Sequence, residues 1–168
     1  GGSAAGEITS WITAFDGISA LAVSSDTVKF VAGAGRGVSR NSFQAGADAA
    51  SDVIKKQNGQ KPDLFIMLPD GITGNGEAIV EGVKSVLGQN APIIGGSLGD
   101  DYLFKKTYEY YEDEVLSDAV VGVGLYGKFS YGLYQWQQDS FYRYNKIHKV
   151  VPDLEYNEVL NVIYDPEI

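Results

Sequence analysis

The sequence has no cysteine and only one histidine, His148. Without cysteine there can be no disulfide and no thiolate metal ligand, and a single imidazole excludes a multi-histidine metal site. A Ser-His-Asp triad would depend on His148, whose neighbours Arg143, Lys146 and Lys149 are basic and disfavour a general base. We therefore expect no metal site, no cofactor and no catalytic residue. The lack of cysteine also fits a reducing compartment, and we expect a cytoplasmic protein.

Basic residues are scarce, with 13 Lys and Arg against 22 Asp and Glu, so the formal net charge is −9. A surface of this charge repels phosphate backbones and anionic lipid headgroups, which argues against nucleic acid and membranes as partners. Long apolar runs are also missing, and none approaches the roughly 20 residues of a membrane-spanning helix. Hydrophobic residues make up 44% of the chain, as in a globular domain with a core of its own.

Apolar residues in the first two thirds of the chain alternate between strand-like and helix-like spacing. Residues 18–23 and 28–31 predict a hairpin with its turn at Ser24-Ser25-Asp26. Residues 33–37 are glycine-rich and are interpreted as a flexible loop. Further segments predict a helix at 42–57 with Ser42 as its N-cap and a buried strand at 64–68. A second helix capped by Thr73 or Asn75 and stopped by Gly88, and a strand at 93–94, are predicted to follow.

The strand, helix and strand between residues 64 and 94 predict a right-handed βαβ unit with parallel strands. Ligands collect at the carboxyl ends of such strands, so Asp70-Gly71 and Gly96-Ser97 should share one rim. Beyond this unit, residues 107–116 predict a tyrosine-rich hairpin, and residues 119–126 and 129–135 predict strands joined by a turn at Gly127-Lys128. Residues 157–165 predict a strand or a short helix. The fold class is α/β, with α+β as the alternative: a mixed sheet with antiparallel hairpins, covered by helices.

A Gly-Gly-Ser loop occurs twice, at Gly1-Gly2-Ser3 and at Gly95-Gly96-Ser97. Glycines at these positions allow exposed N–H groups to form an anion-binding nest, although a plain tight turn has the same composition. Acidic residues follow both loops, Glu7 after the first and Asp100-Asp101 after the second. This similarity suggests a two-fold internal repeat.

Asp100 and Asp101 are adjacent carboxylates beside Tyr102. They could accept hydrogen bonds from a ligand ammonium while nearby N–H groups bind its carboxylate, which would suit an amino acid; adjacent acids are otherwise simply solvated. The predicted ligand-binding residues are Ser97, Asp100, Asp101, Asp70, Gly95, Gly96 and Tyr102, with Ser3 and Glu7 as their equivalents in the first copy.

Two other functions remain open. Asp70 with Asp100 or Asp101 could serve a carboxylate-based hydrolase or isomerase, which would need one carboxyl of raised pKa. Alternatively, Tyr108, Tyr110 and Tyr111 could form a protein–protein interaction surface, which would require them to be exposed.

Several motifs in order resemble the N-terminal FIST domain. They are the opening Gly-Gly-Ser-Ala-Ala-Gly-Glu-Ile, then Leu68-Pro69-Asp70-Gly71 with Gly74-Asn75-Gly76-Glu77, then residues 94–101 and the stretch 115–122. The resemblance implies a sensory domain of intracellular signalling proteins that binds a small molecule, with amino acids among the candidates, and that works with a C-terminal FIST domain or a signalling output domain. It supplies no catalytic residues. The family's first strand and helix would precede Gly1, so we expect residues 1–139 to be a sensory domain incomplete at its start. Residues 140–168 would be a connecting segment or the beginning of a C-terminal FIST partner.

Overall fold

The computed structural model describes residues 1–8, 13–14, 17–131, 133–138 and 143–149. The chain divides into two compact units, Gly1–Gly127 and Lys128–Ile168. In the second unit, β9 (Leu133–Gln138) and β10 (Arg143–Lys149) form an antiparallel hairpin. The expected strand at 129–135 overlaps β9, but the expected pairing across a turn at Gly127-Lys128 is wrong, because β9 pairs with β10. The segment predicted at 157–165 lies outside the described residues.

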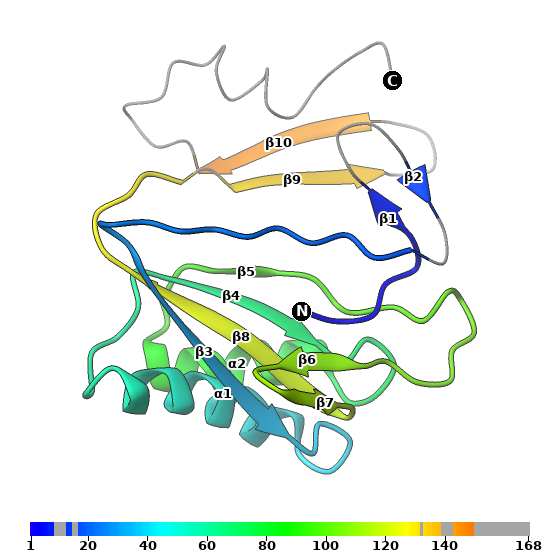
Figure 1. Ribbon diagram of the computed structural model, residues 1–168, viewed down its shortest axis with the longest axis horizontal. Helices are drawn as coiled ribbons and strands as arrows, with labels where there is room; N and C mark the ends of the chain where they lie inside the picture. The colour runs from blue at the N-terminus through cyan, green and yellow to red at the C-terminus, as the bar shows by residue number, and fades with distance from the viewer. Residues whose placement is uncertain (9–12, 15–16, 132, 139–142, 150–168) are drawn as a thin grey trace. The chain divides into compact units, whose positions relative to one another are not determined.

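The first unit is built on a four-stranded mixed sheet in the order β3-β8-β4-β5 (Figure 1). Its strands are β3 (Lys29–Arg36), β8 (Ala119–Tyr126), β4 (Leu64–Pro69) and β5 (Ile93–Gly95). β4 and β5 are parallel, and β8 runs antiparallel to both of its neighbours. The predicted parallel pair and the α/β class with a mixed sheet are therefore confirmed.

Two helices, α1 (Ser42–Lys56) and α2 (Gly76–Leu87), cover one face of this sheet (Figure 1). Asn75 is the cap of α2, as predicted, and its side chain accepts a hydrogen bond from the Ala78 amide. The cap of α1 is Asn41 rather than Ser42. The Ser42 hydroxyl instead accepts the Asn75 amide at 2.9 Å, which ties the beginnings of the two helices together. Both helices are too short to span a membrane, and no other helix lies in the described part of the chain.

The glycine-rich residues 33–36 belong to β3, so their interpretation as a flexible loop is wrong. Their glycines allow α1 to pack closely on β3. A Cβ on Gly35 would lie 1.9 Å from the Ala45 carbonyl oxygen, and a Cβ on Gly33 would lie 2.6 Å from the Ala49 carbonyl oxygen. Ala45 and Ala49 are themselves fully buried. Small residues on both elements thus let the backbone of α1 lie directly on the strand.

The hairpin expected over residues 18–31 does not form. Residues 18–23 pair with no strand in the described structure, and Ile18 and Leu21 are 97% and 89% exposed. β3 pairs instead with β8, in a register that places Ala32 opposite Val123. An apolar, β-branched composition predicts an extended backbone, but it does not identify the partner strand.

A hairpin of β6 (Glu109–Tyr111) and β7 (Glu114–Leu116) covers part of the sheet face opposite the helices. Tyr111 and Leu116 pack there against Ala34 and Val121. The start of the chain joins this hairpin, because Gly2 forms an antiparallel bridge with Glu109. Two short paired strands, β1 (Glu7–Ile8) and β2 (Thr13–Ala14), follow. The described residues show no internal repeat, since the first Gly-Gly-Ser segment pairs with β6 whereas the second ends β5.

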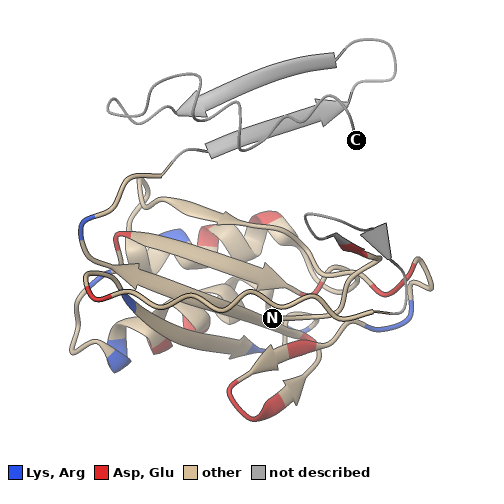
Figure 2. Ribbon diagram, turned by 45° about the horizontal axis from the view of Figure 1, so that its top comes forward, with Lys and Arg blue, Asp and Glu red and all other residues tan. Residues whose placement is uncertain are grey.

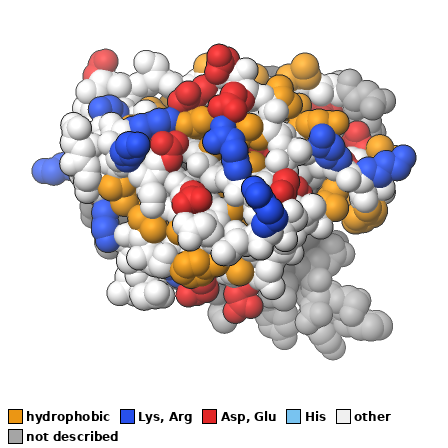
Figure 3. Space-filling model, turned by 90° about the horizontal axis from the view of Figure 1, so that it is seen from below, with side chains coloured by type: hydrophobic (Ala, Val, Ile, Leu, Met, Phe, Trp, Pro, Cys, Tyr) orange, Lys and Arg blue, Asp and Glu red, His pale blue; other side chains and the backbone are white. Residues whose placement is uncertain are grey.

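Charge is unevenly distributed on the first unit. Acidic residues gather on the β6–β7 hairpin (Figure 2). On the face seen from the helix side, acidic and basic side chains are intermixed (Figure 3). This face therefore offers no continuous basic surface of the kind that binds a phosphate backbone.

Candidate functional site

A groove of about 470 Å³ lies between α2 and the β4–β5 edge of the sheet. It is at the carboxyl ends of the parallel strands, the position where open α/β sheets usually bind ligands. Its walls come from α2 (Gly76, Val80, Lys84), from β4 (Met67, Pro69) and from the chain around β5 (Ala91, Ile93, Ile94, Gly95, Gly96, Ser97). Most of these side chains are apolar, with polar groups only at the ends.

The glycines of the second Gly-Gly-Ser loop shape this groove in different ways. Gly95 has a φ of +147°, and a Cβ there would lie 1.8 Å from the Met67 carbonyl oxygen, so the strand pairing requires glycine. Gly96 has open space where a Cβ would be. A side chain at position 96 can therefore be introduced without a clash, which makes this residue a useful probe of the groove.

The polar groups of the groove are Ser97, Lys84 and the start of α2. Lys84 forms an ion pair with Glu81 at 3.0 Å, and its side chain remains 31% exposed. Gly76 is the first residue of α2, where the helix dipole favours a negative group. Lys84 is in the last turn of α2, roughly 12 Å along the helix from Gly76. The groove thus combines an apolar wall with a carboxylate-binding group towards each end, an arrangement that suits a small molecule with a carboxylate and an apolar body.

Asp70 lies on the same rim as Ser97, as the parallel strands predict. The Leu98 amide donates to the Pro69 carbonyl at 3.0 Å, and a Cβ on Gly71 would be 3.3 Å from Ser97 Cβ. The carboxylate of Asp70 is nevertheless buried, 6% exposed, and accepts the amides of Ile72 and Thr73. Burial would raise its pKa, but these hydrogen bonds, with those from the Thr107 and Thr73 hydroxyls, hold the pKa below its ordinary value.

Asp100 and Asp101 occupy the loop after the groove and differ in what they contact. The Asp100 carboxylate accepts three backbone amides, those of Lys105, Lys106 and Phe104, and the pKa of Asp100 is lowered as a result. Asp101 is exposed and has a φ of +55°, and the next residue, Tyr102, is 75% exposed. Asp100 thus holds its own loop, while Asp101 and Tyr102 face solvent. Ligand contacts by these three residues stay a prediction.

The first Gly-Gly-Ser segment contacts the loop that follows the second one, although the two are far apart in sequence. The Ser3 hydroxyl donates to the Gly99 carbonyl at 2.7 Å and accepts the Tyr108 amide at 3.0 Å, while the Gly99 amide donates to the Ser3 carbonyl. Ser3 therefore anchors the loop that follows the groove. Glu7 is further along, where its carboxylate accepts the Gly17 amide at 3.1 Å.

Sequence reasoning missed a fully buried carboxylate, Glu109, at the start of β6. One of its oxygens accepts the Thr107 hydroxyl at 2.9 Å, and no described residue donates a hydrogen bond to the other. Burial, together with the charges of Asp70 and Asp118, raises the pKa of Glu109 to about 7 against the lowering effects of the Thr107 hydroxyl and the Ala119 amide. Its place in an acidic, tyrosine-rich segment gave no sign of burial. Among the described residues, no group of acidic or histidine side chains is arranged to hold a metal ion.

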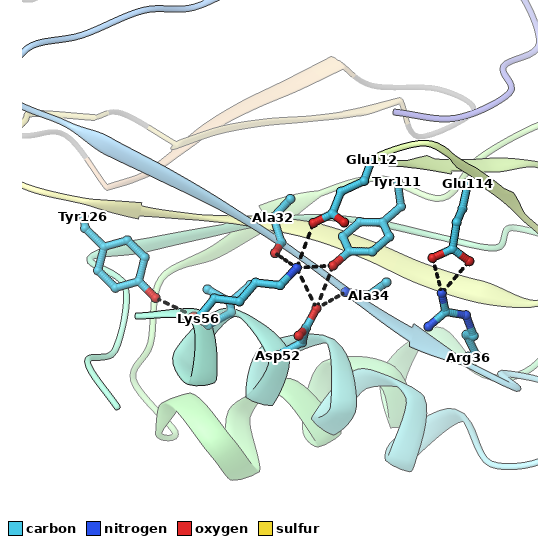
Figure 4. Close-up of polar contacts among 10 residues, drawn as sticks. Ala32, Ala34, Arg36, Asp52, Lys56, Tyr111, Glu112, Glu114 and Tyr126 are labelled. Atoms are coloured by element: carbon cyan, nitrogen blue, oxygen red, sulfur yellow. Dashed lines mark hydrogen bonds and ion pairs between the residues drawn. The ribbon is translucent and has the colours of Figure 1, made fainter. Parts of the chain in front are cut away.

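A second missed cluster surrounds Lys56 at the open edge of β3 (Figure 4). The Lys56 ammonium contacts the Ala32 carbonyl, the Tyr111 hydroxyl and the carboxylates of Glu112 and Asp52. Burial lowers the pKa of Lys56, but the hydrogen bonds to these acceptors outweigh it and raise the pKa above its ordinary value.

Asp52 completes this cluster by accepting the Ala34 amide of the β3 edge at 3.3 Å. Side chains from α1 thus bind an amide and a carbonyl that an edge strand would otherwise leave open to another strand. Because Lys56 stays charged and fully engaged, the cluster is a clamp between α1, β3 and the β6–β7 hairpin rather than a nucleophile site.

No curated protein matches the chain. The family model described as the FIST N domain matches residues 1–139, well over half of the chain. The chain therefore belongs to the FIST N domain family, a family of sensory domains in signal transduction.

Proposed function

We propose that this chain senses a small carboxylate-bearing molecule, with an apolar amino acid as the first candidate, by binding it in the groove between α2 and β5. The observation that carries the proposal is the combination of apolar walls with Ser97 and the α2 start at the carboxyl ends of parallel strands, and with Lys84 in the last turn of α2. Either the α2 amides or Lys84 would bind the ligand carboxylate, Ser97 would hydrogen-bond to the ligand, and Ile93 and Val80 would pack against its apolar part.

Ligand binding in the groove would affect a signalling output through the loop that follows β5. Residues 95–97 line the groove, and Gly99 of the same loop is hydrogen-bonded to Ser3, whose segment is paired with β6. A ligand that orders this loop would also order the hairpin, and the hairpin would present the bound state to a C-terminal FIST domain or an output domain. The proposal includes no catalytic step.

The carboxylate-based hydrolase or isomerase receives less support. Such an enzyme needs one accessible carboxyl that stays protonated. Asp70 and Asp100 both have lowered pKa values, and the carboxyl with a raised pKa, Glu109, is fully buried.

A second candidate function is protein–protein interaction through the β6–β7 hairpin. Tyr108 and Tyr110 are 42% and 50% exposed, whereas Tyr111 is buried against the sheet. An interaction surface would therefore involve Tyr108 and Tyr110 but not Tyr111. Self-association that disappears in Tyr108→Ser and Tyr110→Ser, measured by analytical ultracentrifugation, would support this candidate.

Binding of the twenty amino acids, measured by thermal shift and then by calorimetry, tests the sensing proposal. We expect saturable stabilisation by at least one of them. Gly96→Trp should weaken that binding at least about tenfold by filling the groove, while leaving stability nearly unchanged because position 96 faces open space. Lys84→Met should weaken it by removing the cationic side chain of the groove.

Asp113→Asn, a change in an exposed residue of the distant hairpin, serves as the control and should bind normally. Binding that is equally tight in Gly96→Trp and Lys84→Met would exclude the groove as the site. Absence of binding by every amino acid would exclude this ligand class.

A further inference from the structure

Three carboxylates lie close together where the chain leaves β4 and enters β8, and the hydrogen bonds among them are incomplete. They belong to Asp70, Glu109 and Asp118, with the hydroxyls of Thr73 and Thr107 between them. Glu109 is 0% and Asp70 6% exposed, so solvent contributes little to either. Buried carboxylates need donors from the protein itself.

The two threonines supply too few hydrogens. Thr73 Oγ1 is 2.9 Å from Asp70 Oδ2 and 3.2 Å from Asp118 Oδ1, yet its single hydrogen can be donated to only one of them at a time. Thr107 Oγ1 is 2.9 Å from Glu109 Oε1 and is also within hydrogen-bond reach of Asp70. Asp70 also accepts the amides of Ile72 and Thr73, and Asp118 accepts the amide and hydroxyl of Ser39, so these two carboxylates have donors of their own. Glu109 depends on the Thr107 hydroxyl and the nearby Ala119 amide, and its Oε2 accepts no hydrogen bond from a described residue.

We propose that Glu109 is a proton-binding site whose proton completes this network and keeps the first residues of the chain paired with β6. With the proton on Oε1, Glu109 donates to the Thr107 oxygen. The Thr107 hydrogen is then free for Asp70 and the Thr73 hydrogen for Asp118, and the unpartnered Oε2 belongs to a neutral carboxyl instead of a buried carboxylate. Loss of the proton adds a third negative charge beside Asp70 and Asp118, the titratable groups that face Glu109.

The backbone of Glu109 is paired with the neighbouring segments, so loss of the Glu109 proton affects them as well. Glu109 bridges Gly2 on one side and pairs with Leu116 on the other. Ser3 and Tyr110 donate their amides across the same junction, to Tyr108 and Gly1 at 2.8 and 2.9 Å. Repulsion at Glu109 therefore loosens the pairing of residues 1–3 with β6. Because burial raises the pKa of Glu109 to about 7, the change falls near neutral pH.

Amide hydrogen exchange at Ser3 and Tyr110, corrected for intrinsic rates at pH 5.5 and 8, measures this loosening without any ligand. Protection in the wild-type protein should fall more than about tenfold over this range. Glu109→Gln, which keeps the shape and cannot ionise, should lose most of that dependence. Asp113→Asn, an exposed acid of the same hairpin, should behave as the wild type.

Two results would overturn the proposal. One is an unchanged pH dependence in Glu109→Gln. The other is a Glu109 carboxyl carbon that titrates near its ordinary value of 4.5, observed by NMR in the wild-type chain. The second measurement decides the question even if the variant does not fold, and neither depends on whether the groove binds an amino acid.

Discussion

Asp70 stabilises the turn that follows β4, because its buried carboxylate accepts two backbone amides and a threonine hydroxyl. We expect Asp70→Ala to lower the free energy of unfolding by about 2 kcal/mol, since hydrogen bonds to a charged group contribute more than neutral ones. Urea unfolding at pH 7 measures this loss. Because the folded-state pKa of Asp70 is below its ordinary value of 3.8, the stabilisation is complete above that value and disappears as pH falls through the folded pKa.

Asp113→Ala is the matched control, since Asp113 is an exposed acid, and its effect should stay within about 0.5 kcal/mol. Equal losses in the two variants would mean that the hydrogen bonds of Asp70 do not contribute to stability.

Candidate site residues could be predicted from the sequence where their position depends only on the direction of the strands. Asp70 and Ser97 could be placed on one rim because the carboxyl ends of parallel strands must meet. Glu109 could not be found, because its burial comes from the pairing of Gly2 with β6, a contact between residues far apart in sequence. Asp100 could not be recognised as a loop-stabilising residue either, because its bonds to the amides of residues 104–106 depend on the conformation of the loop and not on its composition.

At the scale of elements, the packing of α1 on β3 depends on Gly35. Gly35→Ala would place a methyl group 1.9 Å from the Ala45 carbonyl oxygen, so the helix must move away from the sheet. We expect a loss of about 3 kcal/mol in the free energy of unfolding, measured by urea or thermal unfolding.

Gly76→Ala is a matched control at the start of α2. A Cβ there meets nothing within 4 Å, and Gly76 is already helical, so this variant should be neutral or more stable by up to about 1 kcal/mol. If Gly35→Ala were as stable as Gly76→Ala, the close approach of α1 to β3 would be contradicted.

Helices were easier to predict than strand partners. Periodic apolar residues and the Asn75 cap placed α1 and α2 nearly correctly, because these signals are local. Residues 33–36 have the glycine-rich composition of a loop, yet they form part of β3. Their small side chains are explained by α1, which packs directly on them. Residues 18–23 have the composition of a strand, yet a strand also needs a neighbour, and composition does not provide one.

The whole molecule should be most stable on the acidic side of neutrality. The folded-state pKa of Glu109, about 7, exceeds its ordinary value of 4.5, so its stabilising effect is complete below 4.5 and is lost as pH rises through 7. That loss is on the order of 3 kcal/mol. Repulsion within a chain of net charge −9 acts in the same direction. Asp70 and Asp100 act oppositely, but only below about pH 4, where their carboxylates become protonated.

Urea unfolding between pH 4 and 8 should therefore give a maximum near pH 5 and a decline towards pH 8. In Glu109→Gln only the shallower decline caused by net charge should remain. Stability that is constant or increases from pH 5 to 8 would contradict the assignment of a raised pKa to Glu109.

The segment at residues 18–23 has a practical consequence for work with this protein. Its backbone N–H and C=O groups are not engaged with another strand of the described structure, and Ile18 and Leu21 project into water. A stretch of this kind is a template on which further chains can add as strands, whereas the edge of β3 is already blocked by Asp52 and Lys56. We expect concentrated samples to form intermolecular β-structure from this segment first, and a lysine at position 18 to delay its onset.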